Sequence, residues 1–188
     1  MGGYESVWKG RLVVRSDFIK SPTLSKLLLH STNITEPPGQ FNSSRGHLIS
    51  TYLLSDTPSS FKDDVEKFDR QEIKYAGFNL LLLSPSAHPS GLSFEAALVT
   101  NHGGGGVIQS RLLTAEERRC GGVSNGVDGQ GGNEWPKVTQ GVQSLTELFA
   151  NLPRDINESA LTESLFKLLT YVVGKKKIFI FFFLDAHR

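Results

Sequence analysis

The order of the expected elements predicts an α+β fold in which helices pack on an antiparallel sheet. Two short helical patterns, at 45–54 and from 57 onward, come before three strand patterns at 75–84, 92–100 and 107–113. Two longer helical patterns follow at 135–152 and 157–171. Helices, then strands, then helices are typical of layers built around one core. A chain of 188 residues is long enough to bury such a core in a single domain.

The first elements are a strand and a helix. Leu27–Ile34 is apolar and turns polar at its end, which favours a strand, and the following Pro37-Pro38-Gly39 requires a loop. A further short strand is expected at Arg11–Val14. Ser43-Ser44 supplies a helix cap for Arg45–Leu54, whose apolar residues fall on one face.

The second helix is expected to begin at Thr57, with Pro58 in its first turn. Apolar residues recur at helical spacing after that point. The charged positions between them are expected to face water; they are Asp63, Asp64, Glu66 and Lys67.

The three central strand patterns differ in character. Tyr75–Ser84 is almost continuously apolar, which is typical of a strand covered on both faces. A loop is expected at Pro85–Gly91, a more alternating strand at Leu92–Thr100, a turn at Asn101–Gly106 and a third strand at Val107–Leu113.

Two amphipathic helices complete the pattern. Trp135-Pro136 opens Trp135–Leu152, and an Asn-x-x-Ala cap opens Asn157–Tyr171. The later apolar run Ile178–Leu184 is far shorter than the roughly 20 residues that cross a bilayer, so no transmembrane helix is expected.

Composition excludes several classes of function. A net charge of +1 gives no electrostatic footprint for nucleic acid. The single cysteine, Cys120, allows no intramolecular disulfide. The histidines lack the spacing of metal ligands, and no metal site is expected; they are His30, His47, His88, His102 and His187.

No conventional catalytic motif stands out. His102 and the glycines after it resemble an esterase oxyanion loop, but the chain has no Gly-x-Ser-x-Gly elbow, so a hairpin insertion is the better interpretation. Cys120 has no evident base beside it. Asn33, Asn79 and Asn125 lie near strand ends, where an amide can donate to an oxyanion or can simply bind backbone.

Five short motifs in one order carry a family resemblance. They are Thr32-Asn33, Arg45-Gly46-His47-Leu48, Gly77-Phe78-Asn79-Leu80, Gly122-Val123-Ser124-Asn125 and Trp135-Pro136-Lys137-Val138. In this order they resemble the Transport and Golgi organization 2 family, also called the NRDE family. The resemblance covers about 32–171, which we expect to be the family domain between atypical segments at 1–31 and 172–188.

The resemblance implies a fold and a set of site residues. Family members are similar to N-terminal-nucleophile hydrolases, so an αββα sandwich is expected, here incomplete. Asn33 and Asn125 match asparagines that hold an oxyanion or substrate in related amide hydrolases. The family's nucleophile is a cysteine after the initiator methionine, and an Asn-Arg-Asp-Glu motif follows. This chain has Gly2 there and lacks the motif, so no catalytic residue is assigned and a partial or mis-spliced form is expected.

Three functions follow from the resemblance. The first is a non-enzymatic role in Golgi organisation and secretory transport, with haem or lipid trafficking. The second is an amide hydrolase, if a true Met-Cys start lies upstream. The third is a structural or interaction domain. A cytoplasmic protein associated with the Golgi or mitochondria is expected, with a small molecule or haem as ligand.

Overall fold

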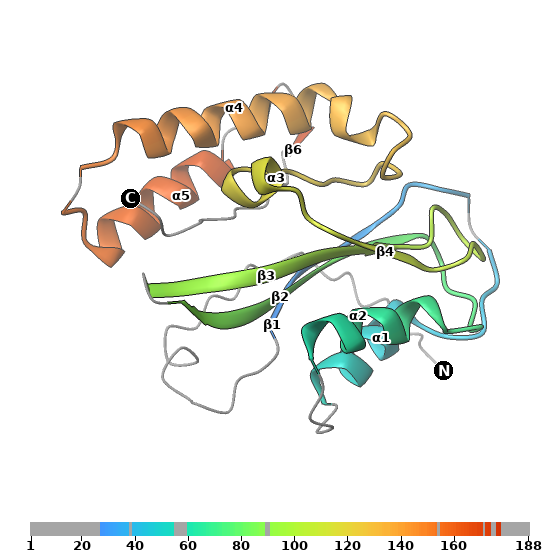
Figure 1. The fold of residues 1–188 in the computed structure, drawn as a ribbon. Helices are drawn as coiled ribbons and strands as arrows, with labels where there is room; N and C mark the ends of the chain where they lie inside the picture. The colour runs from blue at the N-terminus through green and yellow to red at the C-terminus, as the bar shows by residue number, and fades with distance from the viewer. Residues whose placement is uncertain are drawn as a thin grey trace, which may run out of the picture.

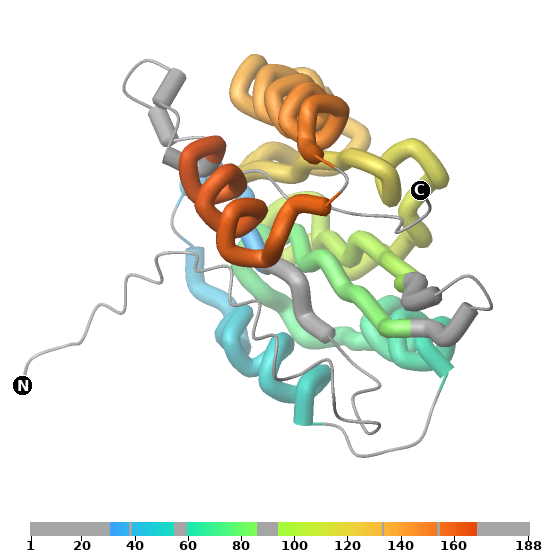
Figure 2. Tube along the Cα trace, turned by 90° about the vertical axis from the view of Figure 1, so that its left-hand side faces the viewer, coloured from blue at the N-terminus to red at the C-terminus, as the bar shows by residue number. Residues whose placement is uncertain are grey.

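A four-stranded antiparallel sheet forms the middle of the computed structural model, which describes residues 27–37, 39–54, 60–88, 91–153, 155–170, 172–173 and 176–177. The strands lie in chain order: β1 (Leu27–Asn33), β2 (Phe78–His88), β3 (Gly91–Thr100) and β4 (Gln109–Leu112). Helices cover both faces, α1 and α2 on one side and α4 and α5 on the other (Figure 1, and from the side in Figure 2). The predicted α+β class is therefore confirmed. The strand expected at Arg11–Val14 lies outside the described residues.

Helix α1 (Arg45–Leu53) begins where the sequence predicts. The Ser44 hydroxyl accepts a hydrogen bond from the amide of His47 at 3.1 Å, which satisfies one of the free amides of the first turn. Leu48 and Tyr52 then face the sheet and are buried.

Helix α2 (Phe61–Asp69) begins three residues later than expected. Its N-cap is Ser60, whose side chain and that of Asp63 form a reciprocal capping box. The prediction of a cap at Thr57 was wrong, because Ser60 with an acid three residues on satisfies two amides instead of one. Thr57 itself lies outside the described residues.

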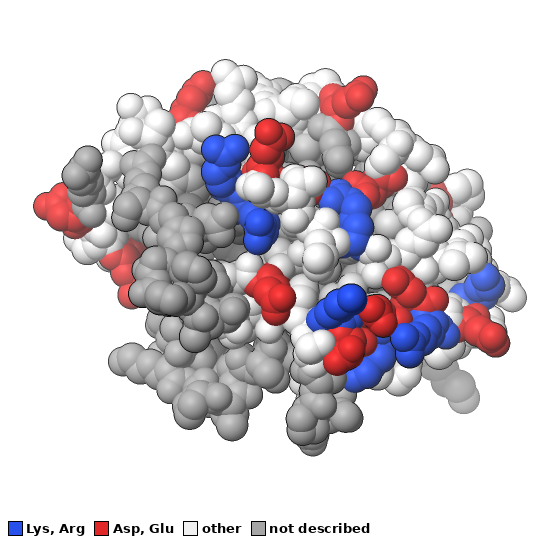
Figure 3. Space-filling model, in the orientation of Figure 1, with Lys and Arg blue, Asp and Glu red and all other residues white. Residues whose placement is uncertain are grey.

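One of the charges expected to face water is buried. Asp64 is only 4% exposed, and its carboxylate accepts from the Lys67 ammonium at 2.8 Å. Glu66 follows the prediction, pairing at the surface with Arg70 at 3.1 Å. Charges of both signs are mixed over this region of the surface (Figure 3).

Strands β2 and β3 form one long hairpin. Their pairing runs without a break from Asn79 opposite Thr100 to His88 opposite Gly91, so the loop expected at Pro85–Gly91 was wrong. The predicted alternation in the next strand was wrong too, since 96–100 are all buried. Both faces of this hairpin are covered, which removes the polar face that alternation would serve.

The larger core lies between the sheet and the first two helices. It consists of Leu48, Tyr52, Phe61, Val65, Phe68, Tyr75, Phe78, Leu80, Leu82, Ala97, Val99 and Ile108. A smaller cluster on the opposite face contains Leu81, Leu83 and Ala96, with Phe94, Leu113 and Val123 against it.

The second half of the chain closes that opposite face. A short helix that the sequence analysis missed, α3 (Ala115–Arg119), follows β4, and a 3-10 turn, η2 (Gly132–Glu134), leads into α4 (Pro136–Asn151). Asn157 caps α5 (Glu158–Thr170), accepting from the Ala160 amide at 2.9 Å as predicted. Two two-residue strands pair beyond it, β5 (Val172–Val173) and β6 (Lys176–Lys177).

No helix in the described part of the chain is long and apolar enough to cross a bilayer. The apolar run Ile178–Leu184 lies outside the described residues.

Candidate functional site

The family-motif residues meet at one end of the sheet, where β1 ends and β2 begins. The segment 122–126, which follows α3, lies beside this end and is bound to it by side-chain and backbone hydrogen bonds. Residues from three separate parts of the sequence therefore form one polar cluster.

Asn79 is the buried centre of this cluster, with 1% of its surface exposed. Its Nδ2 donates to the carbonyl oxygens of Ser124 at 2.9 Å and Gly126 at 2.8 Å. Its Oδ1 is buried without a hydrogen-bond partner in the described structure. Both donors of the amide thus hold the 122–126 segment in place.

The end of β1 binds the same segment through Thr32, Asn33 and Thr35. The Thr32 hydroxyl donates to the Ser124 carbonyl at 2.9 Å, and the Thr35 amide donates to the Asn125 carbonyl at 3.0 Å. The side-chain Nδ2 of Asn125 donates to the backbone carbonyl of Asn33 at 2.6 Å. The structure therefore brings the two predicted ligand residues, Asn33 and Asn125, into direct contact.

The start of α4 adds a cation and an aromatic ring. The Lys137 ammonium lies 3.4 Å from Asn125 Oδ1 and 4.9 Å from the centre of the Trp135 ring. The Trp135 side chain is 37% exposed. Pro136 is the first residue of the helix, where its missing N–H leaves no bond unmade. An exposed ring, an ammonium and an amide carbonyl thus lie together at the surface.

Arg45 and Gly77 connect α1 to the start of β2. Arg45 Nη1 donates to the Gly77 carbonyl at 2.9 Å, and the Ile34 amide donates to the same oxygen. Burial lowers the pKa of the Arg45 guanidinium, and the nearby Glu36 carboxylate opposes this. Gly46 is exposed, and an added Cβ would meet only Ser44 Oγ, at 3.8 Å.

Asn101 is a residue of this region that the sequence analysis missed. It is fully buried; Oδ1 accepts from the Phe78 amide at 2.9 Å, and Nδ2 donates to the Tyr75 carbonyl at 3.1 Å. The sequence signal that could have identified Asn101 is its place between a strand pattern and a run of glycines. The next residue, His102, has a positive φ of 53° and contacts Gln109 Oε1 through Nε2 at 3.0 Å.

Cys120 lies in a different place, at the end of α3. Its sulfur is 3.4 Å from Thr146 Oγ1 and 3.6 Å from the Val142 carbonyl. In the residues that the structure describes, no group of three or more His, Cys, Asp or Glu side chains is placed to hold a metal ion.

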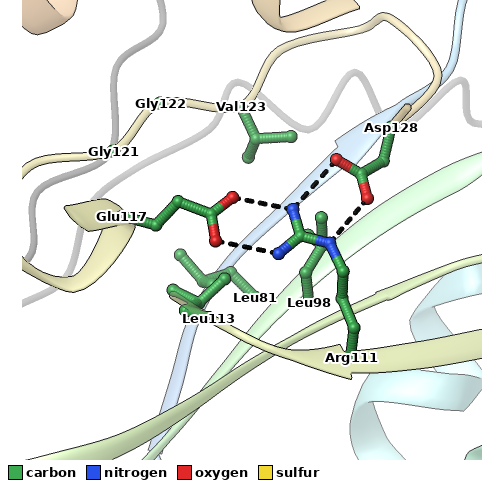
Figure 4. A pocket seen from close by; sticks show the side chains of 9 residues that line it. All are labelled: Leu81, Leu98, Arg111, Leu113, Glu117, Gly121, Gly122, Val123 and Asp128. Atoms are coloured by element: carbon green, nitrogen blue, oxygen red, sulfur yellow. Dashed lines mark hydrogen bonds and ion pairs between the residues drawn. The ribbon is translucent and has the colours of Figure 1, made fainter. Parts of the chain in front are cut away.

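A small cavity of about 30 Å³ lies on the same side of the sheet as α3. Arg111 crosses it and is held on both sides, by Glu117 at 2.7 and 2.8 Å and by Asp128 at 2.8 and 3.0 Å (Figure 4). These two carboxylates raise the pKa of Arg111 further above its usual value. Four of the five N–H groups of the guanidinium bond to these carboxylates, so the cluster joins β4, α3 and the loop before α4.

Comparison with known proteins identifies a family. A family model described as Transport and Golgi organisation 2 matches residues 27–178. No curated protein and no solved structure matches the chain. The matched region contains the whole sheet, α1 to α5 and every member of the polar cluster. The chain therefore belongs to the Transport and Golgi organisation 2 family.

Proposed function

We propose that this protein acts without catalysis in Golgi organisation and secretory transport, by carrying an amphipathic molecule such as haem or a lipid. The observation that supports this best is the surface group at the start of α4. It places the exposed ring of Trp135 under the ammonium of Lys137, next to the amide of Asn125.

This group suits a ligand that has a planar or apolar portion and an acidic group at one end. An exposed indole offers apolar area and a face for stacking, and an ammonium attracts carboxylate or phosphate. Haem has both features, a planar ring and propionate groups. A lipid with an acidic headgroup has the same combination, so the two ligands share one recognition chemistry.

The asparagines support binding rather than catalysis. Asn79 donates both amide hydrogens to carbonyls of the 122–126 segment, and the Asn125 side chain donates to the Asn33 carbonyl. One of the two N–H groups of the Asn125 amide is used in a short bond of 2.6 Å, which holds this side chain against the end of β1. We propose that Asn33 and Asn125 position the ligand surface, within a family domain that spans 32–171.

The ligand is tested by titrating haem into the full chain and following its absorbance. We expect saturable binding with a shifted Soret band, weakened about tenfold or more in Lys137→Met because a charge-assisted contact is lost. Lys167→Met is the matched control, since Lys167 pairs with Glu163 on exposed α5. The absence of any spectral change would remove haem from the proposal. Vesicles with and without anionic lipid test the lipid in the same way.

The cellular role has a separate test. We propose a cytoplasmic protein that associates with the Golgi or with mitochondria. Cells that lack the protein should secrete a reporter slowly and show a disordered Golgi, and the full chain should restore both. Restoration by Lys137→Met to the wild-type level would contradict a role for the α4 surface.

An amide hydrolase stays the alternative. It needs a Met-Cys start upstream, because the single cysteine of this sequence is Cys120, at the end of α3, and residues 1–26 contain none. Incubating linear amides with a form of the protein that begins Met-Cys, and with the same form carrying serine in place of that cysteine, distinguishes this alternative. Turnover by the first form and not by the second would favour the hydrolase over the carrier.

A further inference from the structure

The Glu36 carboxylate is held by two backbone amides from two different loops. Oε1 accepts from the amide of Gly77, just before β2, and Oε2 accepts from the amide of Gly104, just after β3. Both bonds are short, at 2.5 Å. Glu36 itself lies in the connection between β1 and α1 and is half-buried.

The two amides are held in place by bonds that do not involve Glu36. Buried Asn101 fixes the chain before β2 through the Tyr75 carbonyl and the Phe78 amide. The Gly105 amide also donates to the Tyr75 carbonyl, at 2.9 Å, which ties the two loops together. Both N–H groups are therefore directed to one point by the surrounding fold.

Glycine is required at both amides for an acid to approach. A Cβ on Gly77 would lie 2.8 Å from Glu36 Oε2 and 2.9 Å from Ile34 Cβ. A Cβ on Gly104 would lie 2.9 Å from the same oxygen and 2.4 Å from the Phe41 ring. Gly104 is exposed, so water reaches one side of this pair.

The electrostatic setting favours an anion. The Arg45 guanidinium interacts with the Glu36 charge and binds the Gly77 carbonyl at 2.9 Å. Converging backbone amides with a cation behind them are a common way for proteins to bind an anion. Each amide here meets a different oxygen of one planar group, which matches a carboxylate better than tetrahedral phosphate.

We propose that the amides of Gly77 and Gly104 form a carboxylate-binding site, which Glu36 occupies as an internal ligand and which a small carboxylic acid takes when Glu36 is displaced. Glu36 competes as a tethered group, with an effective concentration on the order of millimolar. External acids therefore bind the wild-type chain weakly, and removal of the Glu36 side chain opens the site.

The test is an acetate titration of the ¹⁵N-labelled full chain, followed by the amide resonances of Gly77 and Gly104. In Glu36→Ala we expect both amides to shift together and to saturate at millimolar acetate, with binding at least about twofold weaker in wild type, since the effective concentration of Glu36 adds to the apparent dissociation constant. Glu72→Ala is the matched control, because Glu72 is exposed in the loop after α2, and it should behave as wild type does.

Three results would contradict the proposed carboxylate site. They are no saturable shift of the two amide resonances in Glu36→Ala, the same shift with sodium chloride at equal ionic strength, or saturation with inorganic phosphate but not with acetate. Glu36→Gln covers the case in which Glu36→Ala does not fold, since the amide side chain keeps its shape and one acceptor. In Glu36→Gln, acetate should raise the melting temperature by a few degrees more than chloride does. Equal effects of the two salts would contradict the carboxylate site.

Discussion

The side-chain nitrogen of Asn79 lies 2.9 Å from the carbonyl oxygen of Ser124, so an interior strand of the sheet holds a loop 45 residues further along the chain. The Thr32 hydroxyl binds the same carbonyl from the neighbouring strand. Two motifs that are far apart in the sequence thus depend on each other. Their physical connection is a buried amide that satisfies loop carbonyls where water does not reach.

Asn79→Ala should destabilise the fold by about 2–4 kcal/mol. The change removes two hydrogen bonds and leaves the Ser124 and Gly126 carbonyls without the Asn79 donors, and an unmade buried bond costs about 1–3 kcal/mol. Urea unfolding of the full chain, followed by circular dichroism, measures the difference.

Asn151→Ala is the control for that substitution. Asn151 is exposed at the end of α4, and its amide donates to the Glu147 carbonyl one turn away. A surface change of this kind is expected within about 0.5 kcal/mol of wild type. Equal losses in the two variants would show that the Asn79 bonds do not hold the loop.

Most of the fold was predictable because its elements carry local signals. Ser44 and Asn157 cap their helices as expected, and the apolar run after Tyr75 forms a strand buried on both faces. The α2 cap was missed because Thr57-Pro58 competes with Ser60 in the same stretch. The length of the β2–β3 hairpin was missed because Pro85 favours a loop, whereas partner pairing decides the outcome.

The site was predictable only in part. The resemblance picked out Asn33 and Asn125, and the structure brings them together, yet their roles as ligand residues stay a prediction. Asn101 and Glu36 were not singled out, since each acts through contacts with residues 23 or more positions away. Such contacts depend on the sheet register, which no local pattern reveals.

Glu117 should make stability fall in acid. Its hydrogen bonds from Arg111 hold its pKa below the usual 4.5. A carboxyl whose folded pKa is depressed stabilises the fold above its unfolded pKa, and this contribution is lost as pH falls through the folded value. Stability of wild type should therefore decline below about pH 4.5, and the decline should be shallower in Glu117→Gln.

Unfolding by urea at pH 7, 5 and 3.5 checks this dependence. Glu147→Gln is the control, because Glu147 is exposed on α4 and accepts from Gln143 rather than from an arginine. Parallel pH curves for wild type and Glu117→Gln would contradict the assignment of this acid sensitivity to the Arg111 cluster.

Two of the family-motif glycines, Gly46 and Gly77, should respond to alanine in opposite ways. Gly77→Ala places a Cβ 2.9 Å from Ile34 Cβ, and overpacking of this kind costs about 1–3 kcal/mol. Gly46 is exposed in the first turn of α1 with open space around it, so alanine there should stabilise by up to about 1 kcal/mol. Thermal melts of both variants measure these changes in stability. A loss of stability in Gly46→Ala would contradict the prediction and would point to a role for that glycine beyond folding.

Ser60→Ala should cost about 1 kcal/mol, because it removes the N-cap of α2. The Ser60 hydroxyl accepts from the Asp63 amide at 3.1 Å, and Asp63 Oδ2 accepts from the Ser60 amide at 3.2 Å. Loss of a serine cap costs about 0.5–2 kcal/mol. Thr57→Ala is the informative comparison, since the sequence pattern alone places the cap there. If urea unfolding finds the larger loss in Thr57→Ala, α2 begins earlier than the structure describes; if Ser60→Ala loses more, the capping box at Ser60 and Asp63 sets the start of the helix.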